Sequence, residues 1–142
     1  MARGKQAYLD HLRKVPLFSS CSTKDLQRIA RATDETTLNA GAKLADQGQQ
    51  GREAYVIVDG TCTVTRNGKK VATLGPGDVV DELSLLDHGP RTATVTADTP
   101  MTVLVLDQRH FIAVLDDVPA LSHKLLANLA GRIREFDRKN FG

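Results

Sequence analysis

Two residues nine positions apart, Glu82 and Arg91, carry side chains that could bind the two polar parts of a ribose-phosphate. The planar guanidinium of an arginine gives a phosphate two parallel charge-assisted hydrogen bonds. A carboxylate accepts the hydrogen bond that a ribose hydroxyl donates. A short helix beginning near Glu82 or Leu83 would add backbone N–H groups that face an anion. The segment 80–95 therefore predicts a pocket for a ribose-phosphate.

The same segment resembles the phosphate-binding cassette of the cyclic nucleotide-binding domain family. That family's pattern is Phe-Gly-Glu-Leu-Ala-Leu-Leu, a short spacer, and then Pro-Arg-Ala-Ala-Thr-Val. Here residues 80–86 read Val-Asp-Glu-Leu-Ser-Leu-Leu, and residues 90–95 read Pro-Arg-Thr-Ala-Thr-Val. Similar stretches at Val15–Phe18, Tyr55–Gly60 and Leu74–Val80 extend the resemblance over nearly the whole chain. A long motif with correct internal spacing is a far more specific signal than a lone glycine-rich loop.

The resemblance implies a role for each residue of the cassette. Arg91 would pair with the cyclic phosphate, and Glu82 would take the ribose 2′-hydroxyl. The backbone N–H groups of Ser84 and Thr92 would also face the phosphate, and the Thr92 hydroxyl could reach a phosphate oxygen or a base edge. The ligand-binding residues implied in this way are Val80, Asp81, Glu82, Leu83, Ser84, Arg91 and Thr92.

Each of these residues also has a purely structural interpretation. Arg91 could be a surface arginine after a proline turn, and Glu82 could be stabilised by a helix dipole. Thr92 could be a β-branched residue opening a strand. Val80 and Leu83 would line the sugar, but core packing explains them equally well.

Asp81 departs from the family pattern, which has a glycine before the glutamate. Glycine is used where a side chain would collide or where φ is positive, and aspartate tolerates the left-handed region better than most residues. A carboxylate about 5 Å from the phosphate, at an effective dielectric of about 20, would repel it by about 3 kcal/mol. That repulsion would lower the affinity for the nucleotide about a hundredfold. If Asp81 instead pairs with Arg91, it occupies the place of the phosphate. We expect Asp81 to weaken or abolish nucleotide binding.

The composition predicts an ordinary globular protein. The chain has 142 residues, of which 41% are hydrophobic, and a net charge of +2. This indicates one domain, residues 1–142, with no general attraction to nucleic acid or membrane. No apolar run approaches the roughly 20 residues of a spanning helix, and no signal-peptide region follows the basic N-terminus. We therefore expect a cytoplasmic protein, with Cys21 and Cys62 as free thiols.

The hydrophobic pattern changes period twice along the chain. Residues 5–32 have helical spacing, with a capping box beginning at Ser22. Residues 34–106 are rich in Thr, Val and Ile with recurring Gly and Pro, which is typical of short strands. Asn67-Gly68 marks the clearest hairpin, because both residues tolerate positive φ. Residues 107–139 are helical again.

The last helical region is expected to begin at Asp107, which can cap a helix. A longer helix then carries one apolar stripe of five residues. The stripe consists of Leu121, Leu125, Leu129, Ile133 and Phe136. Leu125, Leu129 and Ile133 could form a lid over the nucleotide base, but the plain helical spacing of the stripe favours ordinary core packing for them. The order of the elements predicts an α+β fold, in which N- and C-terminal helices flank an eight-stranded β-roll (a jelly-roll, or double-stranded β-helix).

The resemblance implies a cyclic nucleotide-binding regulatory module for cAMP or cGMP rather than an enzyme, with no cofactor beyond that ligand. In the family, ligand closes the cassette and draws in the C-terminal helix, where a partner would sense binding. The effector would be another protein or a domain outside this sequence.

Two alternatives remain open from the sequence. A degenerate domain could bind no nucleotide and act as an interaction module, forming a homodimer through the C-terminal helix. A cupin-like metal enzyme would need clustered metal ligands, and the four histidines are scattered.

Overall fold

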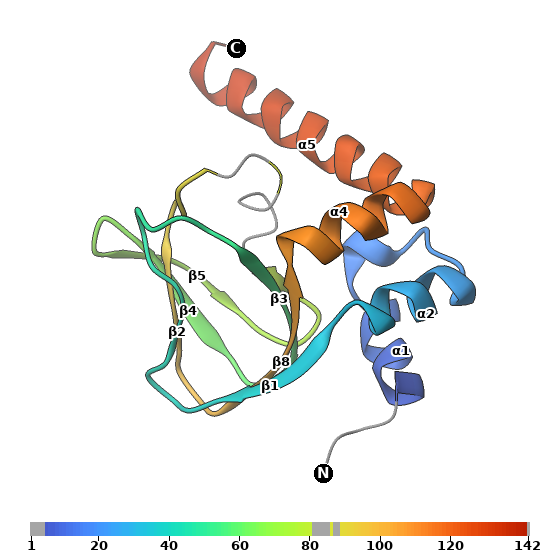
Figure 1. Cartoon of the computed structure of the whole chain (residues 1–142). Coiled ribbons are helices and arrows are strands. Elements are labelled where there is room, and N and C mark those ends of the chain that lie inside the picture. The colour runs from blue at the N-terminus through green and yellow to red at the C-terminus, as the bar shows by residue number, and fades with distance from the viewer. Residues whose placement is uncertain (1–4, 81–85, 87–88, 142) are drawn as a thin grey trace.

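The computed structural model describes residues 5–80, 86 and 89–141. Helices begin and end this part of the chain, and strands lie between them (Figure 1). The helical elements are α1 (Lys5–Arg13), η1 (Pro16–Phe18), α2 (Thr23–Arg31), α4 (Gln108–Asp117) and α5 (Pro119–Asn140). The eight strands within the described residues are β1 (Asp34–Leu38), β2 (Lys43–Ala45), β3 (Glu53–Asp59), β4 (Cys62–Arg66), β5 (Lys69–Leu74), β6 (Val79–Val80), β7 (Thr94–Ala97) and β8 (Met101–Asp107).

The strands form two four-stranded sheets with antiparallel pairing throughout the described residues. One sheet has the order β1-β8-β3-β6 and the other β2-β7-β4-β5. The chain passes back and forth between the sheets, so that they close on each other as a roll (Figure 1). The predicted α+β fold with an eight-stranded β-roll between helices is confirmed.

Side chains along β3 point alternately into the two hydrophobic clusters of the molecule. Val56 and Val58 belong to the cluster that the helices form on the outer face of the first sheet. Tyr55 and Ile57 belong to the cluster inside the roll. Since successive side chains of a strand point to opposite faces, one strand contributes to both clusters. The inner face of β3 is the one that faces the second sheet.

Side chains cap the N-terminal ends of α2 and α4, as the sequence predicts. The Ser22 side chain accepts a hydrogen bond from the Asp25 backbone N–H, and the Asp25 side chain accepts one from the Ser22 N–H. This is the predicted capping box, with Asp in the place of Glu. The Asp107 carboxylate accepts a hydrogen bond of 2.8 Å from the His110 N–H and so caps α4.

Two turns of the roll require unusual backbone geometry. Asn67 and Gly68 have φ values of 53° and 79°, as the predicted tight hairpin between β4 and β5 demands. Gly60, between β3 and β4, has a φ of 89°, and a Cβ there would lie 2.5 Å from the Pro100 carbonyl oxygen. Only glycine fits Gly60 without displacing the neighbouring backbone.

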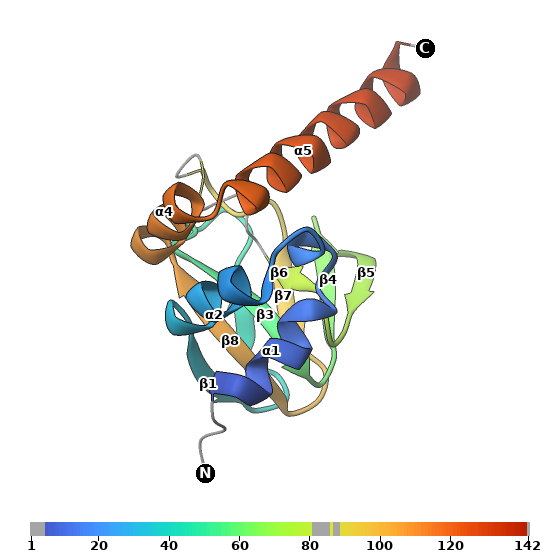
Figure 2. The ribbon, with the colours of Figure 1, turned by 90° about the vertical axis from the view of Figure 1, so that its right-hand side faces the viewer.

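Among the described residues, the final helix is buried only near its beginning. Leu121 and Leu125 are buried in the helix–sheet cluster, and Leu129 packs at its edge. Further along α5, Ile133 and Phe136 are 63% and 59% exposed, and this half of the helix extends away from the body (Figure 2). The interpretation of Leu125, Leu129 and Ile133 as core residues therefore holds for the first two and is wrong for Ile133.

Candidate functional site

The structure places three of the seven predicted site residues. Val80, Arg91 and Thr92 are among the described residues, whereas the predictions for residues 81–84 lie outside them. The two described ends of the cassette, Val80 and Arg91, therefore define the position of the candidate site.

Val80 ends the short strand β6 at the inner face of the roll. It pairs with Tyr55 across the antiparallel ladder between β3 and β6. Its side chain is buried within the roll cluster. Val80 is thus part of the core and also the first residue of the predicted cassette.

Arg91 has a buried side chain, with 9% of its surface exposed. Its Nη1 donates a hydrogen bond of 3.3 Å to the carbonyl oxygen of Leu44, on β2 of the second sheet. The interpretation of Arg91 as a surface residue is therefore wrong. A buried guanidinium is costly unless other groups compensate its charge.

The main chain of Arg91 is held on both sides by the segment that follows β2. The Arg91 N–H donates to the Gln49 carbonyl at 2.8 Å, and the Gly48 N–H donates to the Arg91 carbonyl at 2.9 Å. Gln50 and Pro90 form an isolated antiparallel bridge beside them. These backbone hydrogen bonds fix the direction in which the Arg91 side chain leaves the chain.

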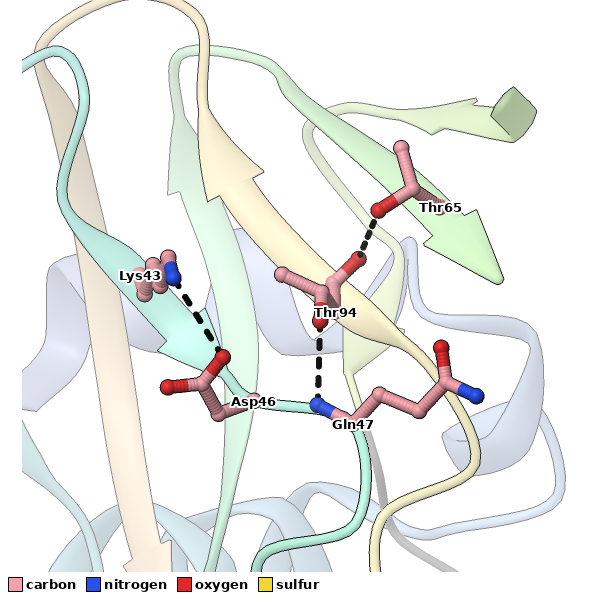
Figure 3. A network of polar contacts seen from close by, with 5 residues as sticks. All are labelled: Lys43, Asp46, Gln47, Thr65 and Thr94. Carbon is pink, nitrogen blue, oxygen red and sulfur yellow. Dashed lines mark hydrogen bonds and ion pairs between the residues drawn. The ribbon is translucent and has the colours of Figure 1, made fainter. Parts of the chain in front are cut away.

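A network of polar contacts joins the same segment to the second sheet. The Gln47 N–H donates to the Thr94 hydroxyl at 3.0 Å, and the Thr65 hydroxyl reaches the Thr94 carbonyl at 3.5 Å (Figure 3). Lys43 and Asp46 form an ion pair at 3.4 Å in the same region. Since both of these charged side chains are exposed, the ion pair stabilises the fold little. The Gln47–Thr94 bond attaches the segment to β7, three residues after Arg91.

Thr92 is exposed and precedes β7 rather than opening the strand. Its carbonyl oxygen accepts a hydrogen bond of 3.1 Å from the Arg66 Nε. The interpretation of Thr92 as the first residue of a strand is therefore wrong, because β7 begins at Thr94.

Two further residues of the site, Glu53 and Tyr55, were missed by the sequence reasoning. They lie two positions apart on β3 and share its inner face. The Tyr55 hydroxyl donates to Glu53 Oε1 at 3.4 Å, and it also interacts with the Arg91 side chain. The register of β3 against β6 places Tyr55 opposite Val80, at the start of the cassette. The inward alternation of β3 was a signal that could have identified Tyr55.

Burial raises the pKa of the Tyr55 hydroxyl above its ordinary value, and the neighbouring Glu53 carboxylate raises it further. The positive charge of Arg91 and a hydrogen bond from it act in the opposite direction on this pKa. The hydroxyl is therefore protonated at neutral pH and lies between a carboxylate and a guanidinium.

Two kinds of feature are absent from the described part of the chain. No group of three or more His, Cys, Asp or Glu side chains among those residues could hold a metal ion. Within the same residues, no helix is both long and apolar enough to cross a membrane.

Comparison with known proteins identifies the fold and the family. The sequence model of the family described as "Cyclic nucleotide-binding domain" matches residues 35–118, which is more than half of the chain. The chain is 36% identical over 109 residues to a cAMP-dependent protein kinase regulatory subunit from Debaryomyces hansenii, covering 76% of this chain and 24% of that protein. It is 33% identical over 141 residues to the corresponding subunit from Schizosaccharomyces pombe, covering 99% of this chain and 32% of that protein.

A solved structure agrees with these sequence matches. The catabolite activator protein of Thermus thermophilus superposes with a TM-score of 0.81 at 29% identity, over 87% of this chain and 61% of that one. The chain therefore spans a quarter to about three fifths of the length of these relatives. By the match of the family model over residues 35–118 and by its fold, this chain belongs to the cyclic nucleotide-binding domain family.

Proposed function

We propose that this chain is a regulatory module that binds cAMP or cGMP and transmits binding through α5, without catalysing a reaction. Arg91 binds the cyclic phosphate, Glu82 accepts a hydrogen bond from the ribose 2′-hydroxyl, and the N–H groups of Ser84 and Thr92 face the phosphate. Val80 and Leu83 line the sugar. The module works in the cytoplasm, and its effector is another protein or another domain.

The observation that carries this proposal is the placement of Arg91. Its side chain is buried and donates to the Leu44 carbonyl on β2, and Arg91 lies in the sequence between β6 and β7. Its main chain is held by Gly48 and Gln49, so little side-chain and backbone freedom remains to be lost on binding. Such preorganisation increases affinity for an anion of fixed geometry, and the guanidinium fork suits a phosphate.

Calorimetric titration of the chain with cAMP and with cGMP tests the proposal. We expect saturable binding of at least one nucleotide, and the preferred nucleotide identifies the signal. Arg91→Lys keeps the charge but loses the bidentate fork, and we expect it to bind about 10- to 100-fold more weakly, because hydrogen bonds to charged groups contribute about 1.5–3 kcal/mol. Equal binding by the Arg91→Lys variant would contradict the assigned role.

Asp81→Gly is titrated in parallel, because Asp81 adds a negative charge next to Glu82 in the sequence. Removing this charge is expected to tighten binding by up to about a hundredfold. Binding that appears only in the glycine variant would make Asp81 the residue that silences the site. Equal affinity in both proteins would overturn the proposed role of Asp81.

The exposed half of α5 favours a second property, self-association. Leu126, Leu129, Ile133 and Phe136 are spaced 3, 4 and 3 residues apart, which is the repeat of a two-stranded coiled-coil seam. All but Leu129 are among the exposed large apolar residues of the molecule. We infer that this seam pairs with a second copy of the chain, because a partner with the same spacing would cover it.

Sedimentation analysis tests the seam. Ile133→Lys is expected to convert dimers to monomers while leaving the circular dichroism of the folded chain unchanged. Ile112→Lys is the matched control, because Ile112 is a 42% exposed apolar residue on α4, outside the seam. Monomers in the unaltered chain, at all concentrations measured, would contradict this inference.

If neither the chain nor its Asp81→Gly variant binds a nucleotide and the chain is a stable dimer, the chain is a degenerate domain that acts as an interaction module. The module then serves association alone. The titration and the sedimentation experiment together distinguish the two functions.

A further inference from the structure

The inner face of β3 changes from apolar to polar toward the candidate site. Ile57 belongs to the core of the roll, Tyr55 packs against that core, and Glu53 begins the strand at the polar end. These three residues share one face because they alternate along the strand. The neighbours paired with Tyr55 are Val80 on β6 and Val105 on β8, neither of which carries a charge.

The Tyr55 hydroxyl has two charged neighbours of opposite sign. It donates to Glu53 Oε1 at 3.4 Å, and it interacts with the guanidinium of Arg91. An ionised carboxylate only accepts hydrogen bonds, and a guanidinium only donates them. The hydroxyl can serve both at once, since its proton goes to Glu53 and its lone pairs remain for Arg91.

Arg91 is held from the opposite sheet as well. Its Nη1 donates to the Leu44 carbonyl on β2 at 3.3 Å, whereas Tyr55 belongs to β3 of the first sheet. The guanidinium is planar and its five N–H donors have fixed directions. Two acceptors on different sheets therefore restrict both its position and the orientation of its plane.

We propose that Tyr55 is a positioning residue for anion binding, and that Glu53 orients the Tyr55 hydroxyl so that it holds the Arg91 guanidinium toward the cyclic phosphate. The inference rests on the proposed function and adds two residues outside the cassette to it. Tyr55 acts through Arg91 and is not assigned a contact with the nucleotide.

The affinity for cAMP at neutral pH gives the first test of the role of Tyr55. Tyr55→Phe keeps the packing of the ring and removes only the hydroxyl, and we expect it to bind cAMP about five- to tenfold more weakly. Tyr8→Phe is the matched control, because Tyr8 lies on α1 in the helix–sheet cluster, on the other side of the first sheet. It is expected to bind as the unaltered chain does. If the unaltered chain binds too weakly to measure, both substitutions are compared in the Asp81→Gly background.

A spectroscopic readout separates positioning from a merely structural role. The chain has two tyrosines and no tryptophan, so the ultraviolet absorbance of phenolate in the Tyr8→Phe protein reports the ionisation of Tyr55 alone. In this background Glu53→Gln is expected to lower the pKa of Tyr55, whereas Arg91→Gln is expected to raise it. Saturation with cAMP is expected to raise it as well, because the phosphate neutralises Arg91. Circular dichroism over the same range identifies the pH values at which the chain is folded.

The outcomes distinguish failure of the inference from failure of the proposed function. Binding of cAMP with equal affinity by Tyr55→Phe, or a Tyr55 ionisation that does not respond to Arg91→Gln, overturns the inference and leaves the proposed function intact. Absence of binding in both the unaltered chain and the Asp81→Gly variant overturns the proposed function, and with it the inference.

Discussion

Gln47 and Asn67 exchange two hydrogen bonds across 20 positions of sequence. Gln47 Nε2 donates to Asn67 Oδ1 at 2.8 Å, and the Asn67 N–H donates to Gln47 Oε1 at 2.9 Å. The pair joins the segment after β2 to the tight turn between β4 and β5. Because Gly48 and Gln49 in that segment hold the main chain of Arg91, the hairpin turn supports the candidate anion site from a distance.

Replacing Gln47 by Ala should loosen this support. The substitution removes both side-chain hydrogen bonds, which together contribute about 1–2 kcal/mol to the free energy of unfolding, and we expect severalfold weaker cAMP binding. Gln47→Glu keeps the acceptor for the Asn67 N–H and should cost less than Gln47→Ala in both measurements. Urea unfolding and calorimetric titration provide the values. Unchanged nucleotide affinity in Gln47→Ala would show that the turn does not support the site.

Gly60→Ala should be one of the most destabilising small substitutions in the roll. Its φ of 89° is unfavourable for alanine, and the added Cβ would meet the Pro100 carbonyl oxygen at 2.5 Å. Gly41→Ala is a matched control, because Gly41 has the same φ of 89° with no atom within 4 Å of the added Cβ. We expect about 1–2 kcal/mol of destabilisation for Gly41→Ala from the backbone alone, and clearly more for Gly60→Ala. Equal losses in urea unfolding would refute the steric account.

The Asp107 cap should make α4 less stable at acid pH than at neutral pH. The hydrogen bond from the His110 N–H is the main cause that lowers the pKa of Asp107 below its ordinary value. Because the pKa of Asp107 is lower in the folded chain than in the unfolded chain, its contribution to the free energy of unfolding is fully present above the ordinary pKa of about 4. That contribution is lost as the pH falls through the pKa of the folded state.

The test compares two substitutions of Asp107. Asp107→Ala should cost about 1 kcal/mol at pH 7, the usual value of an N-cap, and less under strongly acidic conditions. Asn also caps helices, so Asp107→Asn should remain close to the unaltered chain at pH 7 and lose the acid dependence. Thermal unfolding at both pH values measures the difference, and a pH-independent loss in Asp107→Ala would count against this assignment.

The two thiols should react at very different rates. Burial, followed by the charges of Asp98 and Asp78, raises the pKa of Cys62 to about 11, and its side chain is fully buried. Cys21 is only partly buried, although burial raises its pKa as well. Since the thiolate is the reactive form, we expect a thiol reagent at neutral pH to modify Cys21 first and Cys62 only after unfolding. Mass spectrometry of the two peptides measures both rates, and rapid labelling of Cys62 in the folded chain would contradict the prediction.

Local signals in the sequence predicted most of the fold. The capping box at Ser22, the cap at Asp107 and the Asn67-Gly68 turn depend on neighbours within a few residues, and the structure contains all three. The apolar stripe of α5 was predicted in position, but the exposed environment of Ile133 was not. Helical spacing identifies a stripe, but it does not tell which partner covers Ile133.

The candidate site was predictable only where its residues are contiguous in the sequence. Arg91 belongs to a recognisable motif, whereas Tyr55 and Glu53 precede it by more than 35 positions. Tyr55 lies opposite Val80, at the start of the cassette, because of the antiparallel register of β3 with β6, and register arises from the pairing of whole strands. A single sequence contains no motif that links Tyr55 to Arg91, so geometry was needed to connect them.

The partial anchoring of α5 makes this helix a lever. The buried Leu121 and Leu125 hold its first turns, and the 15 residues from Leu126 to Asn140 extend beyond the last buried residue of the helix. At 1.5 Å per residue this arm is about 22 Å long, so a tilt of about 10° at the anchor would displace its tip by about 4 Å. A repacking of Leu121 and Leu125 too small to alter the roll would thus become a displacement of several ångströms at the far end of the helix.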